Sequence, residues 1–327
     1  MKVKFLIIRF SSIGDIVLTT PVIRCLKQQV NGSIVHYAVK KQFLPLLQAN
    51  PYIDKIHCFD NNLNAFIREL KNEGFDYIID LHHNLRTLLI KSRLRILDFS
   101  FPKLNYKKWL IVNFKIDRLP RIHIVDRYMK TLALFDVVND GKGLDYFIPE
   151  GDAMDIGKLP ADFRNGYVAL VVGAKHATKQ LPVDKLISLC SLINKPIVLL
   201  GGKEDVSAGE AIAQNAKGPV YNACGQFSIN QSASLVQQAR LVICPDTGLM
   251  HIAAAFRKKI ISIWGNTIPE FGMAPYLPHE DSRIIQVEGL SCRPCSKIGY
   301  ASCPKKHFRC MNDIDENQMA CLATALF

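Results

Sequence analysis

The sequence predicts an α/β protein made of two domains, the first of them doubly wound. The chain has 327 residues, which is more than a single hydrophobic core usually holds. Short apolar runs alternate with helical stretches along most of its length, a pattern typical of parallel sheets with right-handed crossovers. Between residues 142 and 165 the sequence is rich in Gly, Pro and Asp, and we place a linker there. The predicted domains are therefore 1–155 and 156–327.

Each domain is expected to repeat the unit of strand, short loop and helix. In the first domain a strand over 2–10 runs into the polar turn Ser11-Ser12-Ile13-Gly14-Asp15 and a helix over 16–30. In the second, a helix is predicted over 183–193. The other predicted strands cover 33–39, 53–59, 77–81, 167–172, 196–200, 241–244 and 259–264. Ligands of open α/β sheets bind where such loops leave the strands.

Composition favours a protein that folds throughout and is cytoplasmic. Hydrophobic residues make up 49% of the chain and charged residues 21%, both ordinary for globular proteins. No apolar run reaches the roughly 18 residues of a membrane span, and Arg9 interrupts the opening run before a signal peptide can form. The ten cysteines are therefore expected to be reduced thiols or metal ligands.

Positive charge is concentrated in the first half. The formal net charge is +12, and residues 86–130 hold 12 Lys and Arg against three Asp. Aromatic residues are interleaved with these cations, which suits an anionic membrane surface, although a solvated face over a core would look the same. Nucleic acid is not an expected partner, because no nucleic-acid-binding motif accompanies the charge.

A phosphate site is predicted at Cys244-Pro245-Asp246-Thr247-Gly248-Leu249-Met250-His251, which leaves a strand and opens a helix. Thr247 and Gly248 fall at the helix N-terminus, where free N–H groups and the helix dipole favour an anion. The alternative is that Asp246 only caps the helix. A full dinucleotide-binding fingerprint is absent, which argues against a nicotinamide dehydrogenase.

Two further loops carry candidate residues. Lys175 and Lys179 follow the strand at 167–172, where either could neutralise a diphosphate or simply be solvated. Asp15, in the first loop, is placed to accept a proton from an attacking hydroxyl, although a carboxylate there can also serve as a helix cap.

Taken together, these motifs resemble glycosyltransferase family 9, the ADP-heptose:lipopolysaccharide heptosyltransferases and their relatives. The resemblance covers nearly the whole chain. It rests on the order and spacing of Arg9 to Asp15 with Thr20-Pro21, Lys179-Gln180-Leu181-Pro182, Asp246 to His251, and Trp264-Gly265-Asn266-Thr267.

This resemblance implies a GT-B fold, with two Rossmann-like domains facing across a cleft, and an inverting reaction without a catalytic metal. No cofactor is implied beyond a nucleotide-sugar donor similar to ADP-heptose. The implied acceptor is an anionic glycolipid at the inner face of the cytoplasmic membrane. Asp15 is then the general base. The implied donor residues are Lys179, Lys175, Glu204, Asp246, Thr247, Gly248 and His251, and the acceptor residues are Ser11, Ser12, Gly14, Asn84 and Arg86.

The chain departs from the family pattern at two positions of the donor loop. Ala174-Lys175 stands where heptosyltransferases of the family often have a hydroxyl pair, and Leu181 stands where many have Trp. The donor pocket is therefore expected to differ, with heptose as one candidate sugar. The alternative function is a GT-B sugar-nucleotide-binding protein or epimerase without an acceptor glycan, in which a base at Asp15 has no purpose.

Four cysteines near the C-terminus, Cys292, Cys295, Cys303 and Cys310, form a C-x2-C-x7-C-x6-C array. Such spacing can make a structural zinc site. Relatives in the family also carry a Cys-rich C-terminal stretch without a known metal requirement, so we favour reduced thiols over zinc. No feature of the sequence indicates an oligomeric state.

Overall fold

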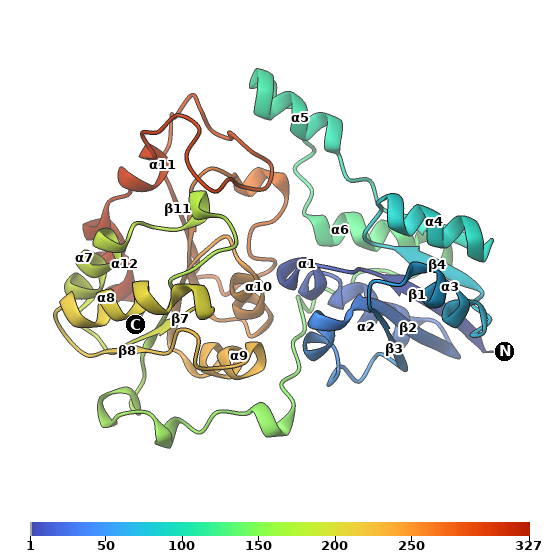
Figure 1. Ribbon diagram of the computed structural model, residues 1–327, viewed down its shortest axis with the longest axis horizontal. Helices are drawn as coiled ribbons and strands as arrows, with labels where there is room; N and C mark the ends of the chain where they lie inside the picture. Colours follow the sequence, from blue (N-terminus) through green and yellow to red (C-terminus); the bar gives the residue numbers. More distant parts are fainter. Residues whose placement is uncertain (1) are drawn as a thin grey trace. The chain divides into compact units, whose positions relative to one another are not determined.

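The computed structural model describes residues 2–327, which divide into two compact units (Figure 1). Unit 1 comprises the residues up to Lys103 together with Ile122–Pro149, and unit 2 comprises Leu104–Arg121 together with Glu150–Phe327. Each unit contains one parallel sheet.

The sheet of unit 1 has the strand order β3-β2-β1-β4-β5, with every pair parallel. Its strands are β1 (Val3–Ile8), β2 (Ser33–Lys40), β3 (Lys55–Phe59), β4 (Tyr77–Asp80) and β5 (Leu97–Ser100). Its α-helices are α1 (Ile13–Val17), α2 (Thr20–Gln29), α3 (Leu63–Lys71), α4 (Leu85–Leu94) and α6 (Ile124–Met129).

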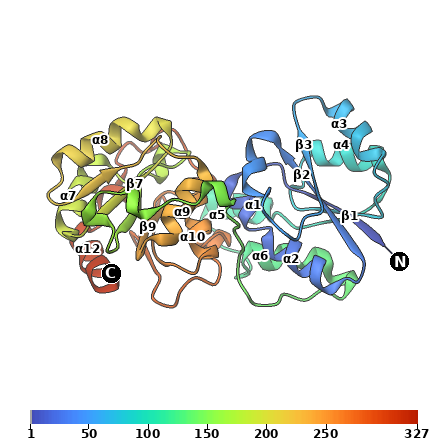
Figure 2. The same cartoon turned by 90° about the horizontal axis from the view of Figure 1, so that it is seen from below.

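Helices cover both faces of this sheet (Figure 2). Leu6 and Ile8 of β1 point to the face on which α3 and α4 pack, and they share a core with Phe66. Phe5 and Ile7 alternate with them and point to the other face, where α2 and α6 lie. Both faces are buried, which is why β1 reads as a continuous apolar run.

The sheet of unit 2 has the order β11-β10-β9-β6-β7-β8, again with parallel pairs. Its strands are β6 (Val168–Val171), β7 (Ile197–Leu200), β8 (Val220–Asn222), β9 (Leu241–Pro245), β10 (Lys259–Trp264) and β11 (Arg283–Gln286). Its α-helices are α5 (Asn105–Phe114), α7 (Val183–Ile193), α8 (Val206–Asn215), α9 (Ile229–Gln238), α10 (Gly248–Ala255), α11 (Arg309–Asn312) and α12 (Glu316–Leu326).

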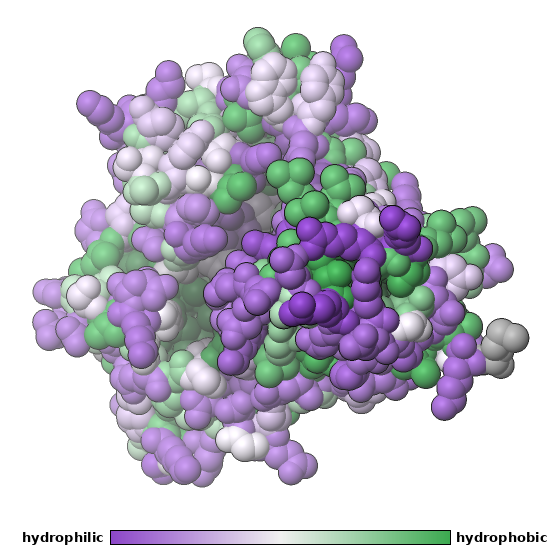
Figure 3. All heavy atoms as spheres, turned by 45° about the vertical axis from the view of Figure 1, so that its right-hand side comes forward, coloured by the Kyte–Doolittle hydropathy of each residue, from purple (hydrophilic) through white to green (hydrophobic). Residues whose placement is uncertain are grey.

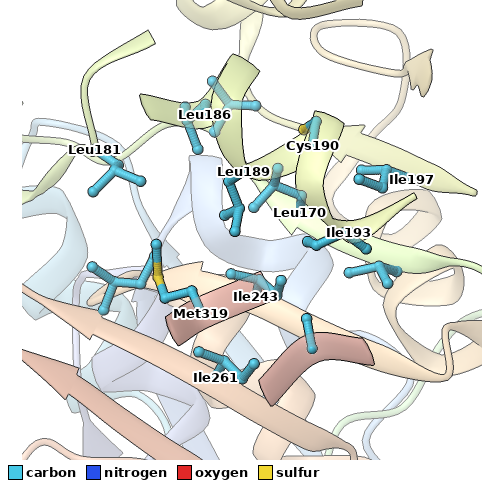
Figure 4. Close-up of a cluster of buried hydrophobic side chains, with 14 of the residues drawn as sticks. Leu170, Leu181, Leu186, Leu189, Cys190, Ile193, Ile197, Ile243, Ile261 and Met319 are labelled. Atoms are coloured by element: carbon cyan, nitrogen blue, oxygen red, sulfur yellow. The ribbon is translucent and has the colours of Figure 1, made fainter. Parts of the chain in front are cut away.

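One core of unit 2 lies between the strands and helices α7 and α12 (Figure 4). Leu170 and Ile243 project from neighbouring strands toward Leu189 of α7, and Met319 of α12 closes the cluster. Apolar residues recur at three- and four-residue intervals along α7, so the helix buries one stripe against the sheet.

Helix α5 belongs to unit 2, although its neighbours in the chain belong to unit 1. Ile111 and Leu119 are buried against Phe271, and the Lys115 ammonium donates to the carbonyl oxygen of Pro294 at 2.8 Å. The segment Leu104–Arg121, which the sequence placed in the first domain, 1–155, therefore belongs to unit 2. The basic segment 86–130 is likewise divided between the two units.

All eight predicted strands are present, with ends that shift by one or two residues. The strands β5, β8 and β11 were not predicted. Each is a short edge strand whose positions are exposed or half-buried, so its sequence lacks a continuous apolar run. The predicted helix over 16–30 is two helices, because α1 ends before Thr19 and α2 restarts with Pro21 in its first turn.

A buried ion network ties α2 to the segment that leaves unit 1. The Arg24 side chain is only 3% exposed. Its guanidinium donates to both carboxylate oxygens of Asp140 at 2.8 Å and also pairs with Asp145. Hydrogen bonding from Arg24 lowers the pKa of Asp140 to about 2.

Replacing Arg24 by Met should destabilise unit 1 by about 3–5 kcal/mol at pH 7, because it leaves the two carboxylates without their buried partner. Lys27→Met, which removes a half-exposed ion pair with Asp54 on the same helix, should cost at most about 1 kcal/mol. Urea unfolding measures both.

The stability contributed by Asp140 is present above its unfolded pKa, about 4, and is lost as pH falls toward its folded pKa, about 2. The Arg24→Met variant should lose this part of the acid dependence. Equal losses of stability in the Arg24 and Lys27 variants would show that the network does not hold α2.

Candidate functional site

Strand order reverses once in each sheet, and in open α/β sheets ligands generally bind at such a reversal. In unit 1 the chain builds β2 and β3 on one side of β1, then β4 and β5 on the other. In unit 2 the corresponding reversal lies between β6 and β9. At such points the loops after neighbouring strands diverge and leave a crevice outside the carboxyl ends.

In unit 1, the residues after β1 hold an ion pair at this edge. The Arg9 guanidinium lies 2.7 Å from Oδ1 of Asp15. It is buried and also donates to the carbonyl oxygen of Leu81, after β4, at 2.6 Å. Asp15 Oδ2 accepts from the hydroxyl of Ser12 at 2.8 Å and from its backbone N–H at 3.2 Å.

Asp15 lies inside the first turn of α1, not in the turn before a helix as the sequence suggested. Burial favours the neutral carboxyl, but the charge of Arg9 and the hydrogen bonds from Ser12 outweigh burial and hold the pKa of Asp15 below its usual value. The carboxylate is therefore ionised at pH 7 and can accept a proton, while it also caps the helix.

His82, which follows β4, is a polar residue of this crevice that the sequence did not single out. Burial and the nearby Arg9 charge lower its pKa to about 4, so the ring is neutral at pH 7. Its Nδ1 is buried and has no hydrogen-bond partner within residues 2–327. The ring packs against Phe10 with centroids 5.7 Å apart.

The predicted acceptor residues lie on the loops of this same edge. Asn84 caps α4, since its side chain accepts from the N–H of Thr87 at 3.0 Å. The Arg86 guanidinium lies over the rings of Phe10 and Phe59, at 5.7 and 4.8 Å from their centroids. The carbonyl oxygen of Ser11 accepts a hydrogen bond from the Arg9 guanidinium. The remaining members, Ser12 and Gly14, begin α1.

In unit 2, three side chains meet where β6, β9 and β10 end. The Lys179 ammonium lies 2.6 Å from Oδ2 of Asp246, and the Thr267 hydroxyl donates to the same oxygen at 3.0 Å. Lys179 and Asp246 are both largely buried. The sequence predicted Lys179 and Asp246 separately, and the structure places them in contact.

The start of α10 adds donors beside this pair. Thr247 is the N-cap residue, and its hydroxyl is buried without a hydrogen-bond partner in the part of the chain described. Gly248 opens the helix, and His251 is buried three residues further on. A cation, an unsatisfied hydroxyl and a helix N-terminus are together suited to bind a phosphate group.

A model of glycosyltransferase family 9 (heptosyltransferase) matches residues 63–305. The chain belongs to glycosyltransferase family 9. It is therefore an enzyme that transfers a sugar, which decides against a protein that only binds sugar nucleotides.

Similar proteins agree with this membership. A lipopolysaccharide heptosyltransferase 1 from Campylobacter coli is 24% identical over 297 residues, which cover 81% of this chain and 84% of that protein. A family 9 glycosyltransferase structure from Veillonella parvula covers 100% of this chain and 98% of its own, with a TM-score of 0.79 and 21% identity.

The structure of an E. coli ADP-heptose lipopolysaccharide heptosyltransferase II covers the same shares, with a TM-score of 0.77 and 19% identity. This likeness shows the fold, and the predicted GT-B fold class is confirmed by two α/β units with parallel sheets. No helix within residues 2–327 is long and apolar enough to cross a membrane.

Other predicted donor residues of this family 9 enzyme lie on the loops after β6 and β7. The backbone of Gly173 lies so close to Asp205 that a Cβ atom at position 173 would be 1.9 Å from Oδ2 of Asp205. Only glycine therefore fits at this position. Lys175 is exposed, unlike Lys179. Glu204 is also exposed, in the turn that follows β7, so its predicted contact with a ribose stays a prediction.

Asn266 is a polar residue of this site to which the sequence assigned no role. It follows β10, and the residue is only 1% exposed. Neither its amide nitrogen nor its amide oxygen has a hydrogen-bond partner among the residues described. A buried Asn directly after an apolar strand was the available signal, since such an amide usually needs a partner.

Cys292, Cys295, Cys303 and Cys310 lie near enough to influence one another's pKa, and whether they hold a metal stays a prediction. Within residues 2–327, a different group, His36, His57 and Glu73, brings three ligand atoms within 4.8 Å of one another. Burial raises the pKa of Cys295, and burial raises that of Cys310 to about 11. These thiols are therefore protonated at pH 7.

Lys179→Ala should weaken binding of a nucleoside diphosphate by about 1–3 kcal/mol, because it removes a cation and leaves Asp246 unpaired beside the phosphates. Adding Asp246→Asn to this variant should recover part of the loss. Lys175→Ala is the control, and its effect should be smaller because Lys175 is exposed. Calorimetry that finds unchanged affinity in Lys179→Ala would remove this residue from the phosphate site.

Proposed function

We propose that this enzyme is an inverting glycosyltransferase that moves heptose or a related sugar from a nucleotide-diphosphate donor to a lipopolysaccharide or lipooligosaccharide core acceptor. The observation that carries the proposal is the Lys179–Asp246 pair beside the unsatisfied hydroxyl of Thr247. The names of the relatives, which include ADP-heptose, support that donor class. Ala174-Lys175 and Leu181 allow a sugar other than heptose.

In the proposed reaction, Asp15 acts as general base. Its carboxylate accepts the proton of an acceptor hydroxyl as that oxygen bonds to the anomeric carbon of the donor sugar. The bond from the anomeric carbon to the diphosphate oxygen breaks, and its electron pair leaves with the diphosphate. Attack from the face opposite the leaving group inverts the anomeric configuration.

The departing diphosphate gains negative charge, and unit 2 supplies the groups that stabilise it. Lys179 is held by Asp246, so the ammonium need not be reoriented during the reaction. The hydroxyl of Thr247 and the free N–H groups that open α10 add hydrogen bonds. In this proposal these groups do what a divalent cation does in other glycosyltransferases, and transfer is metal-independent.

Asp15→Asn should lower kcat by about 100-fold or more, because it removes the base and keeps the shape of the side chain. Affinity for the nucleoside diphosphate should stay within about two-fold, since the proposed phosphate groups are all in unit 2. Ser12→Ala, which removes one hydrogen bond to the same carboxylate, is the matched control and should keep most of the activity. Steady-state kinetics with normal turnover in Asp15→Asn would exclude the base.

The proposed acceptor is lipid-linked, and α4 offers a surface for its membrane. Leu85, Leu88 and Leu89 are 80%, 57% and 46% exposed, and their spacing puts them on one side of the helix. Arg93 and Arg95 are exposed at its end. Figure 3 shows hydrophobic residues among strongly hydrophilic ones over unit 1. Such a mixture suits the interface of an anionic bilayer, which supports a cytoplasmic protein peripheral to the inner membrane.

Helix α5 carries a similar mixture on unit 2. Tyr106, Trp109 and Phe114 are exposed, and the rings of Tyr106 and Trp109 stack with centroids 6.2 Å apart. Lys107 lies between the two stacked residues in the sequence. Tyr and Trp are the residues that favour membrane–water interfaces.

Changing Leu85, Leu88 and Leu89 to Ser should reduce binding to anionic vesicles several-fold, because it removes the apolar area that would enter the interface. Changing Leu134 and Val138 to Ser in the same way should leave vesicle binding unchanged. These two residues are also exposed and apolar, but they lie elsewhere in unit 1. Vesicle sedimentation at low salt measures both. Equal binding by the two variants, or no binding by wild type, would contradict the membrane proposal.

A further inference from the structure

A group of polar side chains lies in unit 1 away from the carboxyl edge of the sheet. His36 is on β2 and His57 is on the neighbouring β3. Glu73 follows α3 in the loop that leads into β4, and it contacts Lys4 near the start of β1. The group therefore lies toward the amino edge of the sheet, opposite the edge that carries Asp15.

The ligand atoms of this group are close together and sheltered from solvent. His36 Nδ1 is 3.0 Å from His57 Nε2 and 3.8 Å from Glu73 Oε2. All three ligand atoms lie within 4.8 Å of one another. Both imidazoles are buried, and Phe75 packs edge-on against each ring at 5.3 and 6.0 Å.

We propose that His36, His57 and Glu73 bind a divalent transition-metal ion of the zinc class, with water as the fourth ligand. Two imidazole nitrogens and one carboxylate oxygen are ligands that such an ion prefers. Metal–ligand bonds of about 2.0–2.2 Å imply ligand separations of about 3.3 Å in a tetrahedral site. The separations of 3.0 and 3.8 Å lie on either side of that value, so small side-chain shifts complete the site.

Glu69 orients the second histidine for this role. Its Oε1 lies 2.5 Å from His57 Nδ1, so His57 Nδ1–H donates a hydrogen bond to the carboxylate and the Nε2 lone pair is left for the ion. Ion binding through Nδ1 places the proton of His36 on Nε2.

Two lysines compete with the ion for Glu73. Lys55 pairs with one carboxylate oxygen, and the Lys4 ammonium lies 3.5 Å from the other. The carboxylate thus already attracts positive charge. The Lys55 side chain is 52% exposed, so it can leave for solvent when an ion enters. Lys4 also donates to the backbone oxygen of Glu73 at 2.6 Å and keeps the loop in place.

A metal at this position joins β2, β3 and the loop before β4. The ion has no part in the proposed transfer, because the proposed base and phosphate groups lie at carboxyl edges. Loading should therefore raise the stability of the protein without changing its affinity for a nucleoside diphosphate.

The test is a Co²⁺ titration of the whole protein after treatment with a chelator. A tetrahedral site of nitrogen and oxygen ligands gives visible absorption without the near-ultraviolet charge transfer of thiolates. The control variant Cys292→Ser with Cys295→Ser should keep this spectrum. His57→Gln should abolish it, provided that circular dichroism shows a native fold.

Two variants at exposed positions test the site even if His57→Gln does not fold. Lys55→Gln should tighten Co²⁺ binding about two- to five-fold, because it removes a competing cation. Glu69→Gln should weaken binding about 10- to 100-fold, because it releases the orientation of His57. The proposal fails if no Co²⁺ binds, if the spectrum is that of thiolates and disappears in the cysteine variant, or if neither Lys55→Gln nor Glu69→Gln changes the affinity.

Discussion

Parallel pairing with one reversal of strand order is the constraint on which the rest of this enzyme depends. It sends every loop that follows a strand to the same edge, and it parts those loops at β1/β4 and at β6/β9. Residues far apart in the chain then meet. Lys179 reaches Asp246 in this way, and Arg9 reaches the carbonyl oxygen of Leu81.

The ion pairs at the two carboxyl edges differ in the role that each is suited to play. In unit 2 Asp246 accepts from both Lys179 and Thr267 and so holds the Lys179 ammonium in place, and this cation contacts the diphosphate in the proposed reaction. In unit 1 the Arg9–Asp15 pair holds a carboxylate in its ionised form. For the proposed base Asp15, a low pKa reduces its basicity but keeps the carboxylate unprotonated at pH 7. One pair therefore suits charge stabilisation, and the other suits proton transfer.

The buried strands and the residues at their ends could be predicted from the sequence, because both follow from local patterns. A run such as Leu241 to Cys244 is apolar throughout, so its strand and the loop after it were evident. Half-exposed edge strands lack that signal. The docking of Ile111 on Phe271, which assigns α5 to unit 2, is a tertiary contact that no local pattern encodes. The sequence assigned no role to Asn266 or His82 for a related reason. Both stand out only because they are buried with side-chain atoms that have no hydrogen-bond partner among the described residues, which a sequence does not show.

The central claim is inverting transfer of a heptose-type sugar by protein groups alone. The most direct test is to incubate the enzyme with ADP-heptose and a lipopolysaccharide core acceptor in the presence of EDTA, and to determine the anomeric configuration of the product by nuclear magnetic resonance. The account predicts a product whose new linkage has the configuration opposite to that of the donor, formed without added metal. Retained configuration, or transfer that occurs only when Mg²⁺ or Mn²⁺ is supplied, would contradict it.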